Sequence, residues 1–239
     1  MRLSRFFIDA PLSLGDAVLP EASAHYIGRV LRLNAGAAVQ LFDGSGDEFR
    51  GTLKEVGKKH VIAELTEKLP GLEESPLSIH LGQGLSRGER MDWAIQKATE
   101  LGVAEITPII SDRCEVRLKD ERAEKRLQHW RQIAISACEQ CGRSRLPTLH
   151  SPVTLAEWTG RVSADLKLVL HPVATPLTAH PQPSRLAFLI GPEGGLTEAE
   201  VELANGSGFL PARLGPRVLR TETAPVVALS VAQQLWGDF

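Results

Sequence analysis

The chain has 239 residues, of which 43% are hydrophobic and 23% charged, and its formal net charge is −2. This is an ordinary globular composition, with enough apolar residues for a core that needs no disulfides. The near-neutral charge argues against non-specific nucleic-acid binding over the whole surface, so any RNA contact has to be local.

The sequence shows no sign of a membrane segment or an export signal. No apolar run reaches the ~18 residues of a transmembrane helix. The opening residues, MRLSRFFIDAPLSLG, lack the apolar centre of a signal peptide. The chain has three cysteines, an odd number, so they cannot all pair in disulfides. Together with the missing export signal, this predicts a reducing, cytoplasmic compartment.

The first seventy or so residues are predicted to form a small, mostly β module. Short β-patterned runs at 37–44, 48–56 and 60–69 are separated by Gly, Ser and Lys turns. The segment LPGLEESP at 69–76 follows them and is the best linker in the chain, because it combines two prolines, a glycine and charged residues.

A short helix is predicted ahead of these strands, from a cap at Ser23 to Asn34. Its residues His25, Arg29 and Arg32 fall at i, i+4 and i+7, which places them on one helical face. Such a face suits contacts to RNA phosphates, and an ordinary solvated face is the alternative.

Beyond the linker, strands alternate with helices. Strands are predicted at 77–85, 105–110, 166–171 and 185–190, and helices at 91–102, 121–141 and 221–236. The runs LKLVLH and RLAFLI are almost continuously apolar, which is typical of strands buried on both faces of a parallel sheet. The predicted fold class is therefore α/β, with the small β module at 1–72 and the α/β domain at 73–239.

The strongest local signal is LAFLIGPEGGLTEAEVE at 186–202. A buried strand leads into Gly-Pro-Glu-Gly-Gly, and Thr197 with Glu200 forms a capping box for the next helix. Glycines beyond the carboxyl end of a strand let the backbone approach a ligand, in the crevice where open α/β sheets bind one. The alternative is a tight turn that binds nothing, and the run matches neither a P-loop nor a dinucleotide fingerprint.

A second glycine-containing loop, LGPRVLRTETA, follows at 214–224. Two such loops close together in the sequence suggest two walls of one pocket. Arg220 and Glu222 lie between the turn and the next helix, where an ordinary surface ion pair is the alternative.

Local basic charge is concentrated between Arg113 and Arg145, with nine Lys or Arg against five Asp or Glu. The expected RNA-binding residues are Arg5, His25, Arg29, Arg32, Arg87, Arg113, Arg143 and Arg145, although each alone could be structural or solvated. Cys138 and Cys141 lack the further ligands that structural zinc needs, so we expect them to pack and expect no metal.

Five segments resemble the ribosomal RNA small subunit methyltransferase E family, in the same order and over essentially the whole chain. They are GRVLR (28–32), IQKATELG (95–102), ACEQCGR (137–143), LIGPEGG (189–195) and LGPRVLRTETA (214–224). Members of this family methylate N3 of uridine 1498 in 16S ribosomal RNA. They belong to the SPOUT superfamily, whose cofactor domain carries a deep trefoil knot.

The resemblance implies a PUA-like RNA-binding β-barrel at 1–72 and a knotted methyltransferase domain at 73–239. It further implies a homodimer that acts on the assembled small ribosomal subunit, with no metal and no membrane. The two glycine loops would cradle S-adenosylmethionine. The implied cofactor-binding residues are Leu170, His171, Ile190, Gly191, Pro192, Glu193, Gly194, Gly195, Leu214, Gly215, Val218, Leu219, Arg220, Thr223 and Ala224.

Methylation at N3 of uracil requires loss of the N3 proton, so a base or an anion stabiliser is expected. Glu193 and Glu222 are the carboxylates inside the two loops, and Arg220 could steady negative charge on the uracil oxygens. Hydrogen bonds from either Glu to the loop backbone are the alternative.

Three other functions stay open. The protein could methylate ribose in transfer RNA, or it could be an RNA-binding assembly factor with a vestigial pocket. A nicotinamide-dependent enzyme is disfavoured by the missing fingerprint.

Overall fold

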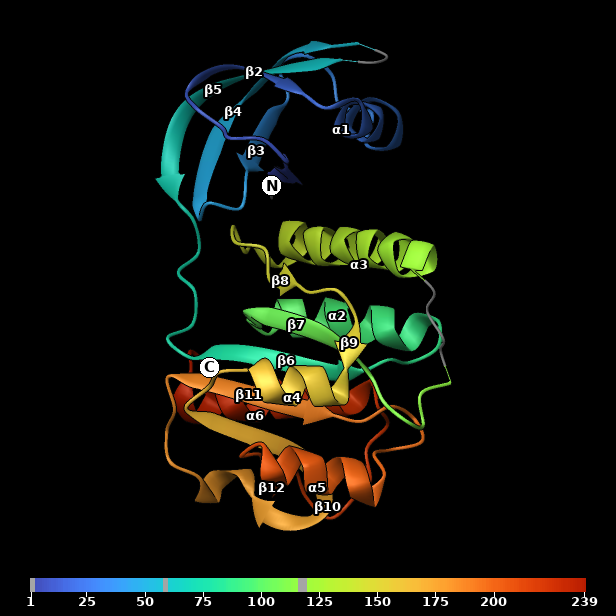
Figure 1. Cartoon of the computed structure of the whole chain (residues 1–239). Coiled ribbons are helices and arrows are strands. Elements are labelled where there is room, and N and C mark those ends of the chain that lie inside the picture. Colours follow the sequence, from blue (N-terminus) through green and yellow to red (C-terminus); the bar gives the residue numbers. More distant parts are fainter. Residues whose placement is uncertain (1–2, 58–59, 116–119) are drawn as a thin grey trace. The chain divides into compact units, whose positions relative to one another are not determined.

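The computed structural model describes residues 3–57, 60–115 and 120–239 (Figure 1). The chain divides into two compact units. Unit 1 comprises Met1–Glu74 and Cys138–Leu146, and unit 2 comprises Ser75–Ala137 and Pro147–Phe239. Unit 1 therefore includes a second segment from the middle of the chain, which the predicted domain boundary at residue 72 did not include.

Among the residues that the structure describes, unit 1 is built on a five-stranded sheet of order β1-β3-β4-β5-β2. Its strands are β1 (Ser4–Phe7), β2 (Gly15–Leu19), β3 (Ala38–Phe42), β4 (Asp47–Val56) and β5 (Val61–Pro70). The β1–β3 pair is parallel and the other pairs are antiparallel. The predicted strands are confirmed as β3, β4 and β5, whereas the short β1 and β2 were not predicted.

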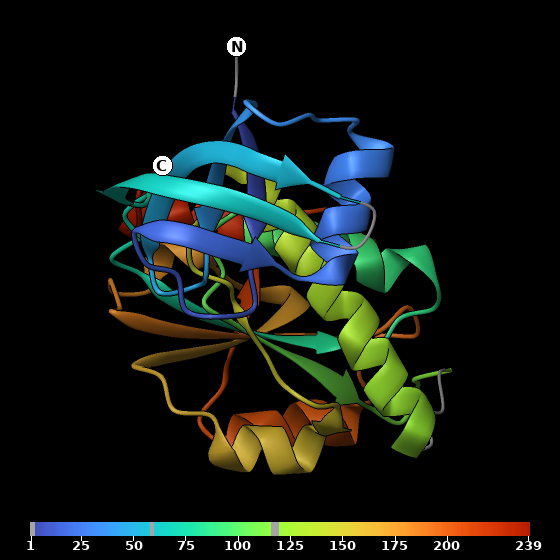
Figure 2. The ribbon, with the colours of Figure 1, turned by 90° about the horizontal axis from the view of Figure 1, so that it is seen from above.

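The helical segment beside this sheet differs from the prediction (Figure 2). It begins as α1 (Glu21–His25), widens into the π-helical turn η1 (Tyr26–Val30) and ends there. Arg32 lies beyond its end with a positive φ of 54°. The prediction that His25, Arg29 and Arg32 share one helical face is therefore wrong, because it assumed 3.6 residues per turn throughout.

Unit 2 contains, within the described part of the chain, a seven-stranded sheet of order β12-β10-β11-β6-β7-β8, with β9 also paired to β7. Its strands are β6 (Ser78–Gly84), β7 (Glu105–Ile110), β8 (Thr148–Leu149), β9 (Val153–Thr154), β10 (Leu166–Pro176), β11 (Arg185–Ile190) and β12 (Leu210–Arg213). Every pair between them is parallel, so the predicted parallel sheet is confirmed.

The helical elements of unit 2 include every helix that was predicted there. They are α2 (Glu89–Glu100), α3 (Asp120–Cys141), α4 (Leu155–Arg161), η2 (Leu177–Ala179), α5 (Glu198–Gly206) and α6 (Thr223–Trp236). The last turn of α3 belongs to unit 1. The capping box of Thr197 and Glu200 is confirmed at α5. Helix α4 was missed, although Thr154 and Glu157 carry the same capping signal.

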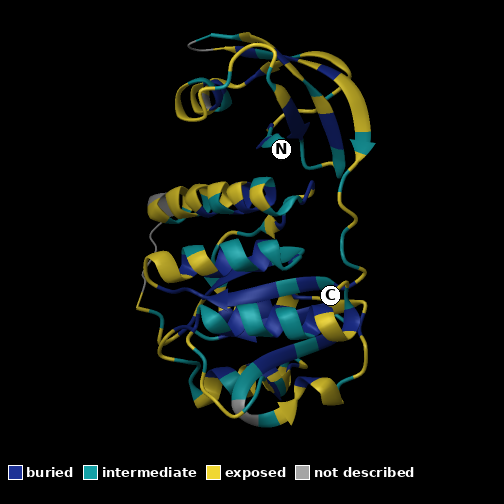
Figure 3. Cartoon of the chain, turned by 180° about the vertical axis from the view of Figure 1, so that it is seen from behind, coloured by how far each residue is buried: buried dark blue, intermediate teal, exposed yellow. Residues whose placement is uncertain are grey.

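The central strands of unit 2 are buried on both faces (Figure 3). Alternate residues of β11 divide between two cores: Phe188 packs with residues of α2, α3 and α6, whereas Leu189 packs with residues of α4 and α5. This division follows from the two-residue period of a strand and explains the near-continuous apolar run. Helices therefore cover both faces, and the ends of the strands remain for a site.

The carboxyl ends of β6, β10, β11 and β12 share one edge of unit 2, because the strands are parallel. The loops at 191–197 and 214–222 both begin there. The trefoil knot that the resemblance implies concerns how these segments thread, and it stays a prediction. Among the described helices, none combines the length and apolarity that crossing a membrane would require.

Candidate functional site

A cavity of about 750 Å³ lies in unit 2 at the ends of β10, β11 and β12. Its volume is in the usual range for a small-molecule site. All the predicted cofactor-binding residues except Gly194 and Thr223 line it. The structure thus brings the two glycine loops together as walls of one cavity, with Leu170 and His171 of β10 beside them.

Several lining residues were not predicted. They are Arg90, Leu196, Glu198, Val201, Glu202, Ala212, Arg213, Arg217 and Thr221. Most adjoin the two loops in the sequence, so a wider window around each loop would have included them. Arg90 is different, because it comes from α2, about a hundred residues earlier. It reaches the cavity because β6, which precedes α2, pairs with β11.

The first loop, residues 191–197, is tightly folded. The N–H of Gly195 donates to the carbonyl of Pro192 at 2.9 Å, and Gly195 has a left-handed φ of 69°. The carbonyl of Gly194 accepts from the guanidinium of Arg113 at 3.1 Å, and a Cβ added at Gly194 would lie 3.0 Å from Arg113 Cβ. Gly194 thus packs against Arg113, and Arg113 braces the loop.

The second loop, residues 214–222, depends on another glycine. Gly215 has a φ of 121°, a conformation that residues with a side chain rarely adopt. Val218 lines the cavity with 84% of its surface exposed. An apolar side chain this exposed beside a cavity offers contact area to an apolar part of a ligand.

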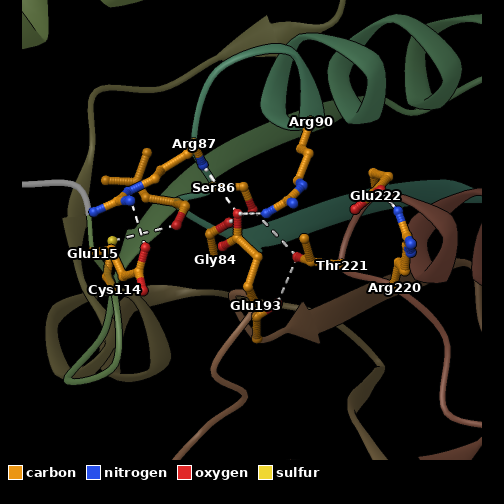
Figure 4. Close-up of polar contacts among 12 residues, drawn as sticks. Gly84, Ser86, Arg87, Arg90, Cys114, Glu115, Glu193, Arg220, Thr221 and Glu222 are labelled. Carbon is orange, nitrogen blue, oxygen red and sulfur yellow. Dashed lines mark hydrogen bonds and ion pairs between the residues drawn. The ribbon is translucent and has the colours of Figure 1, made fainter.

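The Glu193 carboxylate connects the first loop to Arg87 and Arg90 through hydrogen bonds (Figure 4). Its Oε1 accepts from the guanidinium of Arg90 at 2.8 Å and from the backbone N–H of Arg87 at 3.2 Å. Burial alone would raise the pKa of the Glu193 carboxyl, but the hydrogen bonds from Arg90 and from the backbone outweigh it and lower the pKa. The group therefore stays ionised at neutral pH and is a weak base.

Arg220 and Glu222 are joined more loosely. Their Nη1 and Oε1 atoms are 4.0 Å apart, and the Arg220 side chain is 81% exposed. The Glu222 side chain is 18% exposed and makes no capping hydrogen bond, although Glu222 is the N-cap of α6. Of the two predicted carboxylates, Glu222 is thus the one whose oxygens are less engaged by the protein.

The predicted RNA-binding residues fall into distinct environments. In unit 1, the side chains of Arg5 and Arg143 are 9% and 6% exposed, and they pair with Glu48 and Glu74. Arg143 and Glu74 approach to 2.5 Å. Such buried pairs are structural, because breaking them to reach a phosphate would leave carboxylates buried and unpaired.

The remaining predicted cations lie nearer to solvent. His25, Arg29, Arg32 and Arg145 are exposed in unit 1. In unit 2, Arg87 pairs with Glu115 at 2.9 Å on an exposed surface. Of the predicted basic stretch from Arg113 to Arg145, the described exposed cations on α3 include Arg122, Lys125 and Arg126, whereas Arg117 and Lys119 lie outside the described residues.

A separate cluster of His80, Glu105 and His150 lies at the amino-terminal end of the sheet in unit 2, with its polar atoms within 4.8 Å of one another. The indole N–H of Trp158 donates to Nε2 of His80 at 3.3 Å. Oγ1 of Thr107 lies 2.7 Å from the same Nε2, and Nδ1 of His80 lies 3.7 Å from Oε2 of Glu105. Burial lowers the pKa of His80 to about 4, so the cluster is a hydrogen-bond network around a neutral imidazole.

Comparison with known proteins agrees with this architecture. Residues 73–233 match the model of an RNA methyltransferase domain, and residues 19–66 match that of an RNA methyltransferase PUA domain. The ribosomal RNA small subunit methyltransferase E of Buchnera aphidicola is 34% identical, covering all of this chain and 96% of that protein. The enzyme of the same name from Bacillus subtilis is 34% identical over 86% of this chain and 85% of its own length.

Two solved structures are also similar over both full lengths. A protein from Legionella pneumophila in complex with the cofactor S-adenosylmethionine is 43% identical, with a TM-score of 0.98. A ribosomal RNA small subunit methyltransferase E from Neisseria gonorrhoeae, bound to S-adenosylmethionine, is 40% identical, with a TM-score of 0.94.

Fold, cavity and matches together define a two-domain RNA methyltransferase, with an N-terminal PUA-like domain and a parallel α/β domain. The chain belongs to the ribosomal RNA small subunit methyltransferase E family.

Proposed function

We propose that this protein transfers a methyl group from S-adenosylmethionine to N3 of uridine 1498 in 16S ribosomal RNA. The observation that carries the proposal is the cavity formed by the two glycine loops at the carboxyl edge of the sheet. Relatives from Legionella and Neisseria, 43% and 40% identical, hold S-adenosylmethionine. Calorimetric titration of the purified protein with this compound, and with NAD as a comparator, tests the choice of cofactor.

The residues of the cavity fit S-adenosylmethionine. Neither Gly195 nor Gly215 would place an added Cβ within 4 Å of another atom, so the space beside both is open to a ligand. Leu170, Leu214 and Val218 offer apolar surface to the adenine. The carboxylates of Glu198 and Glu202 also line the cavity, where they favour the positively charged sulfonium and ammonium groups.

When bound, S-adenosylmethionine supplies a methyl carbon that its sulfonium activates for displacement. The protein then has to orient the uridine and to manage the N3 proton. Glu222 accepts this proton, because its carboxylate is less engaged than that of Glu193. Arg220 and Arg90 stabilise the negative charge that develops on the uracil oxygens, and Glu193 holds Arg90 in position.

Substituting Glu222 and Glu193 one at a time should distinguish the general base from the carboxylate that positions Arg90. Glu222→Gln is expected to lower the rate of methyl transfer by about 100-fold, because an amide cannot accept the N3 proton. Glu193→Gln should lower the rate by less than about tenfold, because this carboxylate only holds Arg90 in position.

The measurement is the rate of single-turnover methyl transfer at neutral pH, with cofactor affinity determined for each variant as the control. Equal losses in the two variants would contradict the division of roles.

We assign RNA binding to unit 1 through the exposed His25, Arg29 and Arg32, and we propose that the protein acts as a homodimer. The expected substrate is the assembled small subunit. A chain of net charge −2 has little long-range attraction for RNA. Its exposed cations are scattered, so they bind together only to RNA that is already folded.

Methyl transfer to intact small subunits should therefore be faster than to deproteinised 16S RNA at physiological salt. Both substrates have to come from cells that lack this enzyme, so that the target is unmodified. Equal rates on the two substrates would rule out the requirement for an assembled subunit.

A further inference from the structure

Thr221 lies at a junction of three segments in unit 2. Its hydroxyl donates to the carbonyl of Gly191, in the first loop, at 2.9 Å. The same oxygen lies 3.1 Å from Nε2 of Gln83, the last residue but one of β6, and 3.3 Å from Oγ of Ser86. Figure 4 shows Thr221 between Ser86 and the loop that carries Glu193. Thr221 is 7% exposed and Gln83 is 1% exposed, so water does not replace these bonds.

The directions of the hydrogen bonds to Gly191 and Gln83 follow from the chemistry of the groups. A carbonyl only accepts, so the Thr221 hydroxyl has to donate to Gly191. Gln83 therefore has to present its N–H to Thr221, which turns its Oε1 away. Among the described residues, this Oε1 is buried and has no hydrogen-bond partner. An unpaired buried acceptor lowers the folding stability of the protein. The arrangement therefore holds the Thr221 hydroxyl in place at a cost in folding stability.

We propose that Thr221 is a positioning residue whose hydroxyl couples the two loops of the cavity to each other and to the end of β6. Gly191 and Thr221 both line the cavity, one from each loop. Without the hydroxyl, the loops keep their own backbone conformations but lose their mutual position. For the cofactor this inference rests on the proposed function, because a ligand held by both walls binds best when they are already in place.

The test compares Thr221→Val, which keeps the shape but removes the hydroxyl, with Thr221→Ser, which restores it. Amide hydrogen exchange of the ligand-free protein should rise at both 191–197 and 214–222 in T221V and return to the wild-type rate in T221S. The Kd for S-adenosylmethionine should rise about tenfold in T221V, the usual effect of losing one hydrogen bond. In T221S it should stay within about threefold of the wild type.

Gln83→Met tests the same coupling of the two loops independently, from the partner of Thr221. It removes both the donor to Thr221 and the unpaired acceptor, so loop exchange and Kd should increase while the melting temperature stays equal or rises. A merely structural role for Gln83 would lower the melting temperature. If T221V does not fold, loop exchange and Kd in Q83M decide whether the coupling exists.

Thr159→Val is the matched control. Thr159 is 2% exposed, and its hydroxyl donates to the carbonyl of Ala156 in α4 at 3.3 Å. This variant should change neither loop exchange nor affinity. The inference is overturned if the 191–197 loop of T221V exchanges like the wild type, or if T221S is as impaired as T221V. A wild type that does not bind S-adenosylmethionine, with loops that still loosen in T221V, would refute the proposed function and leave the coupling standing.

Discussion

Gly215→Val is expected to abolish S-adenosylmethionine binding while the chain stays folded. Gly215 lines the cavity and has a φ of 121°, where a β-branched residue is strongly disfavoured. The second loop has to change its path to relieve this strain, and the valine side chain also occupies space beside the cavity. Together these effects should raise the Kd by roughly 100-fold or more. Calorimetric titration gives the affinity, and a thermal melt shows that the variant is folded.

Gly208→Val is the matched control for this prediction. Gly208 lies outside the cavity lining, also has a positive φ, of 87°, and an added Cβ there has nothing within 4 Å. This variant should bind like the wild type. Gly194→Val is a less direct test, because the new side chain would press on Arg113 instead of entering the cavity. A folded G215V variant with normal affinity would contradict the assignment of this loop.

Reversing charge at Arg29 and Arg32 should lower methyl transfer to ribosomal RNA by about 100-fold and leave cofactor affinity unchanged. Both side chains are exposed in unit 1. Replacing them with glutamate exchanges phosphate attraction for repulsion, and it reduces the number of counterions released on binding. The salt dependence of RNA affinity should therefore become less steep in R29E/R32E. The measurements are single-turnover rates and RNA affinities at several salt concentrations.

The control has to change the same charge elsewhere in unit 1. Arg50→Glu with Lys68→Glu reverses two exposed cations on β4 and β5, and we expect a much smaller loss. Deleting unit 1 is a poorer experiment. The segment Cys138–Leu146 belongs to unit 1, and Arg143 would lose its partner Glu74. If R29E/R32E methylates at the wild-type rate, the RNA surface has been misassigned.

The sequence was most informative where the signal lies within a few neighbouring residues. Continuous apolar runs predicted the parallel sheet correctly, because a strand with helices on both faces needs apolar side chains on both. The glycine loops were found for the same reason. A buried strand followed by several glycines ends at the edge of a parallel sheet, and the structure brings both loops to one cavity.

Features that depend on distant residues were missed. Arg90 reaches the cavity because β6 and β11 are neighbours, and no spacing within α2 shows this. Arg5 and Arg143 looked like surface cations because their partners, Glu48 and Glu74, are far away in sequence. Residues 138–141 continue the helical pattern of α3, so nothing in the local sequence shows that the segment Cys138–Leu146 belongs to unit 1. The common helical face of His25, Arg29 and Arg32 was predicted for a regular α-helix. It is absent because η1 is a π-helical turn.

The identity of the methylated nucleoside tests the central claim most directly. The protein is incubated with labelled S-adenosylmethionine and unmodified small subunits, and in parallel with bulk transfer RNA. Nuclease digestion and mass spectrometry then identify the nucleoside that carries the label and its position. The account predicts N3-methyluridine at position 1498 of 16S RNA and no label in transfer RNA. A 2′-O-methylated nucleoside in transfer RNA would contradict it, as would active cofactor binding without transfer to either RNA.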